Sequence, residues 1–181
     1  MAGYSHLELK YARPIATAIL GDADFRGWLL RSTRHGGPTY QPVDAQLARG
    51  LRSATMRNPY WFNYWCGKDK RCVCREAPDK AGIETDILIF LDAESVPRLA
   101  LHIEIKRPGE EFLEGQAESY PRRAACWANS CTRPGTVVQH GNSLTVLVCG
   151  RELARDPRSR HFDKVVFHEE VAARIPVYPE P

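Results

Sequence analysis

Glu84-Thr-Asp-Ile-Leu-Ile-Phe-Leu91 and, seven residues later, Leu99-Ala-Leu-His-Ile-Glu-Ile-Lys106 decide the fold of this chain. Both runs are apolar and rich in Ile and Leu, whereas residues 92–98 between them carry polar side chains and a proline. Two short apolar runs separated by a polar stretch are typical of paired strands. We therefore predict an antiparallel hairpin with a longish loop over residues 92–98.

Charged side chains interrupt these apolar runs on one face of the predicted hairpin. Strand side chains alternate between faces, which places together the polar residues Glu84, Asp86, His102, Glu104 and Lys106. Pairing the strands about position 95 sets Leu91 opposite Leu99 and Asp86 opposite Glu104, with Cβ atoms ~5 Å apart. The register therefore predicts two carboxylates and one ammonium group at a single point.

Two carboxylates this close repel each other unless a positive charge lies between them. Carboxylates, water and a main-chain carbonyl suit a hard cation such as Mg²⁺ or Mn²⁺, and the carbonyl of Ile105 is placed to be a third protein ligand. Such a site polarises phosphoryl oxygens, while Lys106 would orient a water or stabilise developing charge. In the alternative interpretation, Lys106 merely neutralises Asp86 and Glu104.

Glu84 and His102 are further candidates on this face, for contact with the metal or the substrate. A histidine on a sheet is more often a packed or hydrogen-bonded residue. Downstream, a helix is predicted from about Glu110 to Trp127, and its Gln116 and Tyr120 lie four apart on one face. An ordinary amphipathic helix explains that spacing equally well. Pro121 favours a kink or a restart of this helix.

Asp86, a spacer and Glu104-Ile105-Lys106 resemble the PD-(D/E)XK nuclease superfamily. Gln116-Ala-Glu-Ser-Tyr120 is similar to the Q-x-x-x-Y motif of its RecB-like and lambda-exonuclease-like branches. The resemblance implies a restriction-endonuclease-like αβββαβ core and a Mg²⁺-dependent nuclease acting on DNA, or on RNA. It also implies that Asp86, Glu104 and the Ile105 carbonyl hold the metal, and that Lys106 serves the hydrolytic water.

The same resemblance places Gln116 and Tyr120 beside the active site and the substrate phosphates. Two further positions can be compared with the superfamily motif. Thr85 stands where the superfamily often has proline, a variation that it tolerates. The superfamily often places a further glutamate in an early helix, and Glu8 is the candidate here.

The pattern of expected helices and strands along the whole sequence predicts one α/β domain, 1–181, with a mixed central sheet flanked by helices. Its parts are a helical N-terminal part (1–57), a catalytic core (83–149) and a C-terminal strand and tail (150–181). Beyond the hairpin we expect helices over 7–20 and 25–30 and after Asp44, strands over 143–149 and 164–168, and a peripheral tail from Ile175. Aromatic residues at 60–65 predict a core segment beside the sheet; the alternative is stacking on bases.

Composition sets limits on function without identifying it. The chain has 181 residues, a net charge of +3 and 43% hydrophobic residues, so charge alone does not indicate a nucleic-acid binder. Arginines at 122–123 and at 151, 155, 158 and 160 could meet phosphates, although a solvated basic surface is the default. No apolar run of membrane-spanning length and no signal-peptide pattern is present, which predicts a cytoplasmic protein with no membrane partner.

Six cysteines raise the question of a structural zinc ion. Cys66, Cys72 and Cys74, with Cys126 and Cys131, supply enough thiolates for Zn²⁺, but their spacing is not that of familiar zinc knuckles. Plain buried thiols are the favoured interpretation, and disulfides are disfavoured in the cytosol. Two rivals to the nuclease hypothesis remain: a nuclease-like fold used only to bind DNA or protein, and a zinc-stabilised interaction module.

Overall fold

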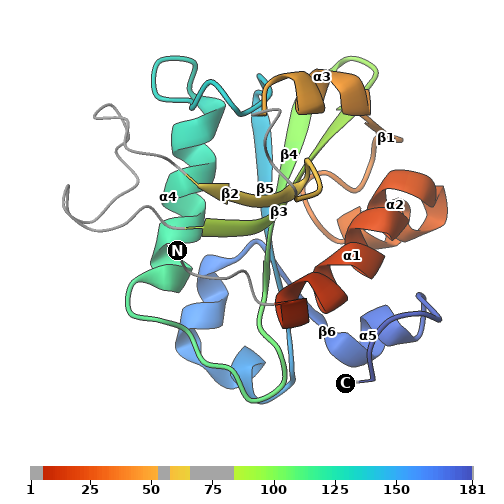
Figure 1. Ribbon diagram of the computed structural model, residues 1–181, viewed down its shortest axis with the longest axis vertical. Coiled ribbons are helices and arrows are strands. Elements are labelled where there is room, and N and C mark those ends of the chain that lie inside the picture. Colours follow the sequence, from red (N-terminus) through yellow and green to blue (C-terminus); the bar gives the residue numbers. More distant parts are fainter. Residues whose placement is uncertain (1–5, 53–57, 66–83, 181) are drawn as a thin grey trace.

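A mixed β-sheet with helices on its two faces forms the centre of the computed structural model, which describes residues 6–52, 58–65 and 84–180 (Figure 1). The strand order is β1-β3-β4-β5-β6, and β2 pairs with β3 beside β1. The strands are β1 (Gln41–Pro42), β2 (Phe62–Trp65), β3 (Glu84–Ala93), β4 (Val96–Ile105), β5 (Asn142–Cys149) and β6 (Lys164–Phe167). The predicted fold class, α/β with a mixed sheet, is confirmed.

The β3–β4 hairpin has the predicted register. The two strands run antiparallel with Leu91 opposite Leu99 and Ile87 opposite Ile103. The longish loop predicted over 92–98 is wrong, because both strands continue into it and Ala93 pairs with Val96. β4, β5 and β6 are mutually parallel, so their carboxyl ends share one edge of the sheet.

The helices are α1 (His6–Gly21), α2 (Ala23–Leu30), α3 (Ala45–Gly50), α4 (Gln116–Ala128) and α5 (His168–Ala172), with 3-10 turns η1 (Leu153–Arg155) and η2 (Pro157–His161). Asp44 caps α3 as predicted, since its side chain accepts a hydrogen bond from the Gln46 amide. Among the described residues, none of these helices has both the length and the apolar character of a membrane span.

Alternation along β3 and β4 divides the interior into two layers. On one face, odd-numbered apolar residues such as Ile87 and Ile103 join a core that includes Ile15 and Ile19 of α1. On the other face, Leu88, Phe90 and Ala100 pack with Trp127 of α4. The charged residues of the hairpin lie on this second face, so α4 is the helix that covers them (Figure 1). Trp61, Phe62 and Tyr64 are buried, which supports the core interpretation of the aromatic segment.

Three sequence predictions about helices and ends need correction. α4 begins at Gln116, not near Glu110, because residues 107–115 form a loop that buries Phe112 and turns at Gly115, where φ is 70°. Pro121 lies inside a continuous α4, and α1 likewise continues through Pro14. The strand predicted to reach residue 168 ends at Phe167, where α5 begins.

The C-terminal tail was expected to be peripheral, and this expectation is wrong. Ile175 and Tyr178 are each only 7% exposed and belong to the same core layer as α1. The Tyr178 ring packs edge-on against that of Tyr11 in α1, with 5.6 Å between the ring centroids. The tail is therefore part of the packed domain.

Candidate active site

Asp86 and Glu104 lie beside each other where the β3–β4 ladder ends. The last regular pair is Ile87 with Ile103, and one step further the amide of Ile105 donates a hydrogen bond of 2.7 Å to Asp86 Oδ2. In an antiparallel pair the N–H and C=O of one residue face the same neighbouring strand. The Ile105 carbonyl therefore also faces β3, on the side of Asp86, as the predicted ligand set requires.

Glu104 is the point on which the other predicted residues converge. Its Oε1 accepts a hydrogen bond of 2.7 Å from Gln116 Nε2 and lies 3.3 Å from Lys106 Nζ. Its Oε2 accepts a hydrogen bond from the Tyr120 hydroxyl. The i, i+4 spacing of Gln116 and Tyr120 thus aims two donors from α4 at one carboxylate. The structure brings Asp86, Glu104, Lys106, Gln116 and Tyr120 together.

Burial makes this charge cluster electrostatically costly. Asp86 is 9% exposed, Glu104 2% and Lys106 8%. Burial and the adjacent Glu104 charge raise the pKa of Asp86 well above its usual value. Burial also raises the pKa of Glu104, against the opposing effects of Lys106 and of the Tyr120 hydrogen bond. Raised pKa values favour the protonated forms of these carboxyl groups, so their full ionisation calls for further positive charge at the cluster.

Glu8 and Glu84 add to the negative charge around this cluster. Burial, followed by the charges of Glu8 and Glu104, raises the pKa of Glu84 to about 7. The pKa of Glu8 is raised by burial and by Glu110. Glu84 Oε1 is buried and has no hydrogen-bond partner within the described part of the chain. Both candidates therefore lie in the electrostatic neighbourhood of Asp86, Glu8 reaching it from α1.

The donor chemistry of this cluster fits a hard divalent cation. Two carboxylates lie together beside a strand end whose carbonyl faces the same neighbouring strand, and burial, followed by the charge of Glu104, raises the pKa of Asp86. No group of three or more Asp, Glu, His or Cys side chains suited to a metal occurs in residues 6–52, 58–65 and 84–180. The predicted set has only two such side chains, because its third protein ligand is the main-chain carbonyl of Ile105.

His102 shares the face of Glu104 but is a core residue. Its side chain is fully buried, with its ring 5.3 Å from that of Trp127 and 6.3 Å from that of His140. Burial and the neighbouring His140 and Arg123 hold the pKa of His102 well below its usual value. The packed interpretation of His102 is thus the one that the structure supports.

The cysteines are divided between described and undescribed parts of the chain. Cys66, Cys72 and Cys74, the candidate zinc ligands, lie outside the described residues. Cys131 and Cys149 are free thiols, Cys131 is exposed, and Cys126 is buried. The zinc hypothesis therefore stays a prediction.

Arg123, one turn beyond Tyr120 on α4, was expected to meet phosphates or solvent, and this expectation is wrong because the residue lies inside the site. It is fully buried, its guanidinium lies 4.2 Å above the Tyr120 ring, and none of its nitrogens has a hydrogen-bond partner among the described residues. Its charge lowers the pKa of both Glu84 and Glu104. Its position seven residues after Gln116 continues the stripe that meets Glu104, and this spacing was the available signal.

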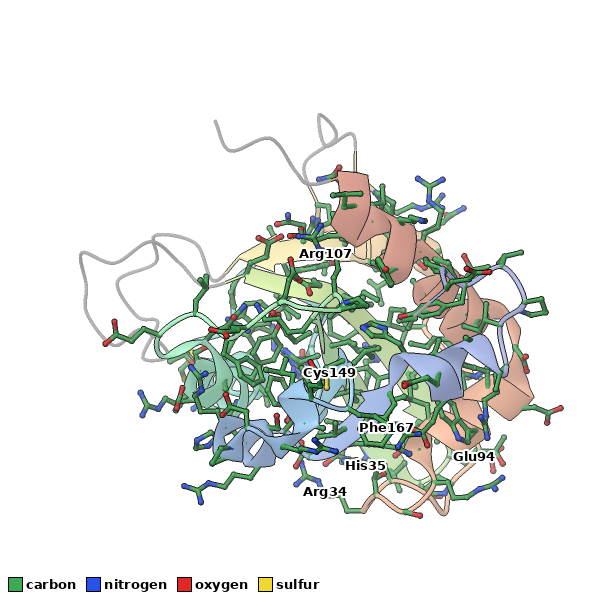
Figure 2. The ribbon with its side chains drawn as sticks, turned by 90° about the horizontal axis from the view of Figure 1, so that it is seen from below. Arg34, His35, Glu94, Arg107, Cys149 and Phe167 are labelled. Carbon is green, nitrogen blue, oxygen red and sulfur yellow. The ribbon has the colours of Figure 1, made fainter. Side chains whose placement is uncertain are left out.

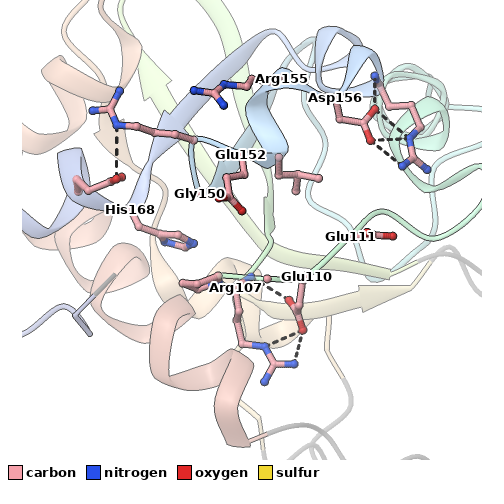
Figure 3. Close-up of a pocket in the computed structure, with 14 residues that line it drawn as sticks. Arg107, Glu110, Glu111, Gly150, Glu152, Arg155, Asp156 and His168 are labelled. Atoms are coloured by element: carbon pink, nitrogen blue, oxygen red, sulfur yellow. Dashed lines mark hydrogen bonds and ion pairs between the residues drawn. The ribbon is translucent and has the colours of Figure 1, made fainter.

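A pocket of about 650 Å³ opens at the carboxyl edge of the parallel strands. Figure 2 labels Arg107, two residues beyond the end of β4, together with Cys149 and Phe167, the last residues of β5 and β6. Asp86, Glu104 and Lys106 do not line the pocket, but Arg107, the neighbour of Lys106, does. Figure 3 shows Arg107 paired with Glu110, across the pocket from Asp156. Asp156 pairs with Arg158.

Three of the six arginines that could meet phosphates, Arg151, Arg155 and Arg158, line this pocket. Arg151 is 3.5 Å from Glu169 and Arg158 is 2.7 Å from Asp156, so part of their charge is already balanced. Surface ion pairs of this kind contribute little free energy. A phosphate could therefore replace the carboxylate partner at small cost.

No protein-family profile, no curated protein and no solved structure matches the chain. What the protein does must be inferred from the geometry and charge of the site.

Proposed function

We propose that this chain is a metal-dependent nuclease of the PD-(D/E)XK superfamily that hydrolyses phosphodiester bonds of DNA. The observation that carries the proposal is the convergence on Glu104: Lys106 Nζ, Gln116 Nε2 and the Tyr120 hydroxyl all meet this carboxylate beside Asp86. These residues come from strand β3, from the end of β4 and the residue directly after it, and from helix α4. A buried point where two carboxylates and an ammonium group meet suits the hydrolysis of phosphodiesters.

Each residue has a role in the proposed reaction. Asp86, Glu104 and the Ile105 carbonyl hold a Mg²⁺ or Mn²⁺ ion, which when bound polarises a phosphoryl oxygen and makes nearby water more acidic. Lys106 orients the attacking water and stabilises charge that develops on the phosphate. Gln116 and Tyr120 hold the Glu104 carboxylate in a fixed orientation. Such preorganisation is the protein's main contribution to this kind of catalysis.

The rival is a nuclease-like fold that binds DNA or protein without cleaving it. One observation favours it: both Glu104 oxygens already accept hydrogen bonds, and the site is almost closed to solvent. In the catalytic proposal, Tyr120 or Gln116 must share Glu104 with the cation. Under the rival proposal, these bonds are permanent and the carboxylates are structural.

The free thiols of Cys131 and Cys149 accord with a reducing compartment, where disulfides are rare. We therefore include a cytoplasmic location in the proposal.

Incubation of the purified chain with linear, nicked and supercoiled DNA tests the proposal directly. The reactions contain Mg²⁺, Mn²⁺ or a chelator, and RNA of the same sequence serves as a parallel substrate. We expect cleavage that requires the metal and that Asp86→Asn and Lys106→Met abolish. DNA binding without cleavage by the folded wild type would support the rival.

A further inference from the structure

His168, the first residue of α5, uses both ring nitrogens although it is fully buried. Its Nε2 lies 2.8 Å from the main-chain oxygen of Lys106, and its Nδ1 lies 2.7 Å from the Tyr178 hydroxyl. A carbonyl oxygen can only accept, so Nε2 carries the proton and donates to Lys106. Nδ1 then accepts from Tyr178, which fixes the neutral tautomer of His168.

The bond from His168 acts where the sheet stops supporting the chain. Lys106 directly follows the last residue of β4, and its amide still donates a hydrogen bond of 2.8 Å to Val148 of β5. β5 itself ends at Cys149, one residue further. His168 supplies the donor that a longer β5 would otherwise have offered to the Lys106 carbonyl. The main chain of Lys106 is thus held at both its amide and its carbonyl.

Packing around His168 ties this bond to two distant segments. The His168 ring is 5.3 Å from that of Tyr11 in α1 and 5.9 Å from that of Tyr178 in the tail. Figure 3 shows His168 at the rim of the pocket, with Arg107 close below it. Tyr178, in turn, is held by burial in the α1 core. The tail therefore reaches Lys106 through a single imidazole ring.

Lys106 needs this support because its side chain must be aimed accurately. Lys106 Nζ lies 3.3 Å from Glu104 Oε1 and 6.0 Å from the centre of the Phe112 ring. The next residue, Arg107, turns away into the loop, where it pairs with Glu110. A rotation of the main chain at Lys106 would move Nζ away from the carboxylates.

We propose that His168 and Tyr178 are positioning residues: Tyr178 sets the tautomer of His168, and His168 fixes the main chain of Lys106. The proposal rests on the function proposed above, since it assigns Lys106 a catalytic role. It adds two residues, from α5 and the tail, that act through the main chain of Lys106.

Three variants and one control test this chain of contacts. His168→Phe removes both hydrogen bonds, Tyr178→Phe removes only the hydroxyl, and His168→Gln keeps an N–H near the position of Nε2. Tyr11→Phe is the matched control, because Tyr11 packs on the same ring but its hydroxyl makes no hydrogen bond within the described residues.

Metal-dependent DNA cleavage is measured as kcat and KM on protein shown to be folded by circular dichroism. We expect His168→Phe to lower kcat about 10- to 100-fold, as displacement of a catalytic group does, with KM little changed. His168→Gln should restore most of the rate. Tyr11→Phe should stay within about twofold of wild type, as substitutions away from specific contacts do.

Because Tyr178 acts through His168, the two effects should not add. Tyr178→Phe should lower kcat in the wild-type background and have no further effect in the His168→Phe background. Additive losses, or equal losses in Tyr178→Phe and Tyr11→Phe, would overturn the proposal.

A second measurement decides the proposal even if the wild type cleaves nothing. Amide hydrogen exchange reports how firmly the main chain is held. His168→Phe and Tyr178→Phe should increase exchange at Lys106 and Arg107, whereas Tyr11→Phe should not. Unchanged exchange in all three variants would refute the positioning role, while absent cleavage with the expected exchange pattern would refute only the nuclease proposal.

Discussion

The amide nitrogen of Ile105 lies 2.7 Å from Asp86 Oδ2, so a carboxylate side chain continues the hydrogen bonding of the hairpin beyond its last regular pair. Asp86 consequently has two functions that can be separated by substitution. Its oxygen satisfies a buried main-chain donor, and its charge faces Glu104.

Asp86→Asn keeps an acceptor for Ile105, whereas Asp86→Ala leaves that amide without a partner. A buried donor left unsatisfied costs about 1–3 kcal/mol, so we expect the Asn variant to have the larger free energy of unfolding by about this amount. Both variants should lose cleavage, because both lose the charge. Urea denaturation measures the difference, and equal stabilities would contradict the structural role of the Asp86 oxygen.

Tyr120→Phe removes the hydroxyl that donates to Glu104. Hydrogen bonds to charged groups contribute about 1.5–3 kcal/mol, and we expect a loss of this size in the free energy of unfolding. Tyr40→Phe is the control, since Tyr40 is 4% exposed and its hydroxyl has no hydrogen bond among the described residues. Equal losses in the free energy of unfolding for Tyr120→Phe and Tyr40→Phe would show that the hydrogen bond to Glu104 does not stabilise the fold.

Metal binding should change in opposite directions in two variants. Mg²⁺ or Mn²⁺ at 100 times its Kd should stabilise the wild type by about 2.7 kcal/mol, seen as a rise in Tm, and Glu104→Gln should erase that rise. Arg123→Met removes a buried positive charge from the carboxylate cluster. We expect it to bind the metal several-fold more tightly, because loss of a like charge close to a cation is worth on the order of 1 kcal/mol.

The Arg123 variant also distinguishes electrostatics from damage to the fold. A variant that is merely disordered near α4 would bind the metal more weakly than wild type. Weaker binding by folded Arg123→Met, measured by calorimetric titration, would therefore contradict the electrostatic role of this guanidinium.

His140 should make stability depend on pH on the acid side of neutrality. Burial lowers the pKa of His140 below its ordinary value of 6.5, while its Nδ1 is 2.8 Å from the Val138 carbonyl. Below pH 6.5 the unfolded chain binds a proton that the folded chain does not. The free energy of unfolding therefore decreases as the pH is lowered, by up to about 1.4 kcal/mol per pH unit. His140→Asn, which keeps the donor, should reduce this slope between pH 6.5 and 5.5. An unchanged slope in urea denaturation would show that His140 does not contribute.

The hairpin could be predicted from sequence because its information is local. Alternation along two runs only seven residues apart fixes both the faces and the register, and Leu91 does lie opposite Leu99. The loop was predicted too long because Asp92 and Arg98 look like loop residues. In the structure Arg98 Nε binds Asp92 Oδ1 at 2.7 Å across the two strands, which lets polar residues occupy paired positions.

The start of α4 shows how tertiary contacts can override a helical pattern. Residues 110–115 could begin a helix on composition, but Glu110 binds both the main chain and the side chain of Arg107. Phe112 is held against Phe162, with ring centroids 6.0 Å apart. Neither partner can be inferred from the segment itself.

Positioning residues of the site were the hardest to predict. His168 lies 62 residues from Lys106 along the chain, and no repeat or spacing links them. The tail around Tyr178 resembles an ordinary proline-rich terminus. Arg123 was closer to prediction, because it continues the helical stripe of Gln116 and Tyr120, but a buried arginine with no hydrogen-bond partner among the described residues is not expected from composition.

Cleavage of supercoiled and linear DNA by the wild type beside Asp86→Asn and Lys106→Met, with Mg²⁺ or Mn²⁺ and with a chelator, tests the central claim most directly. The account predicts metal-dependent breakage of phosphodiester bonds by the wild type and none by either variant, with all three proteins folded. Cleavage that persists in both variants, or a folded wild type that binds the metal yet leaves every substrate intact, would contradict it.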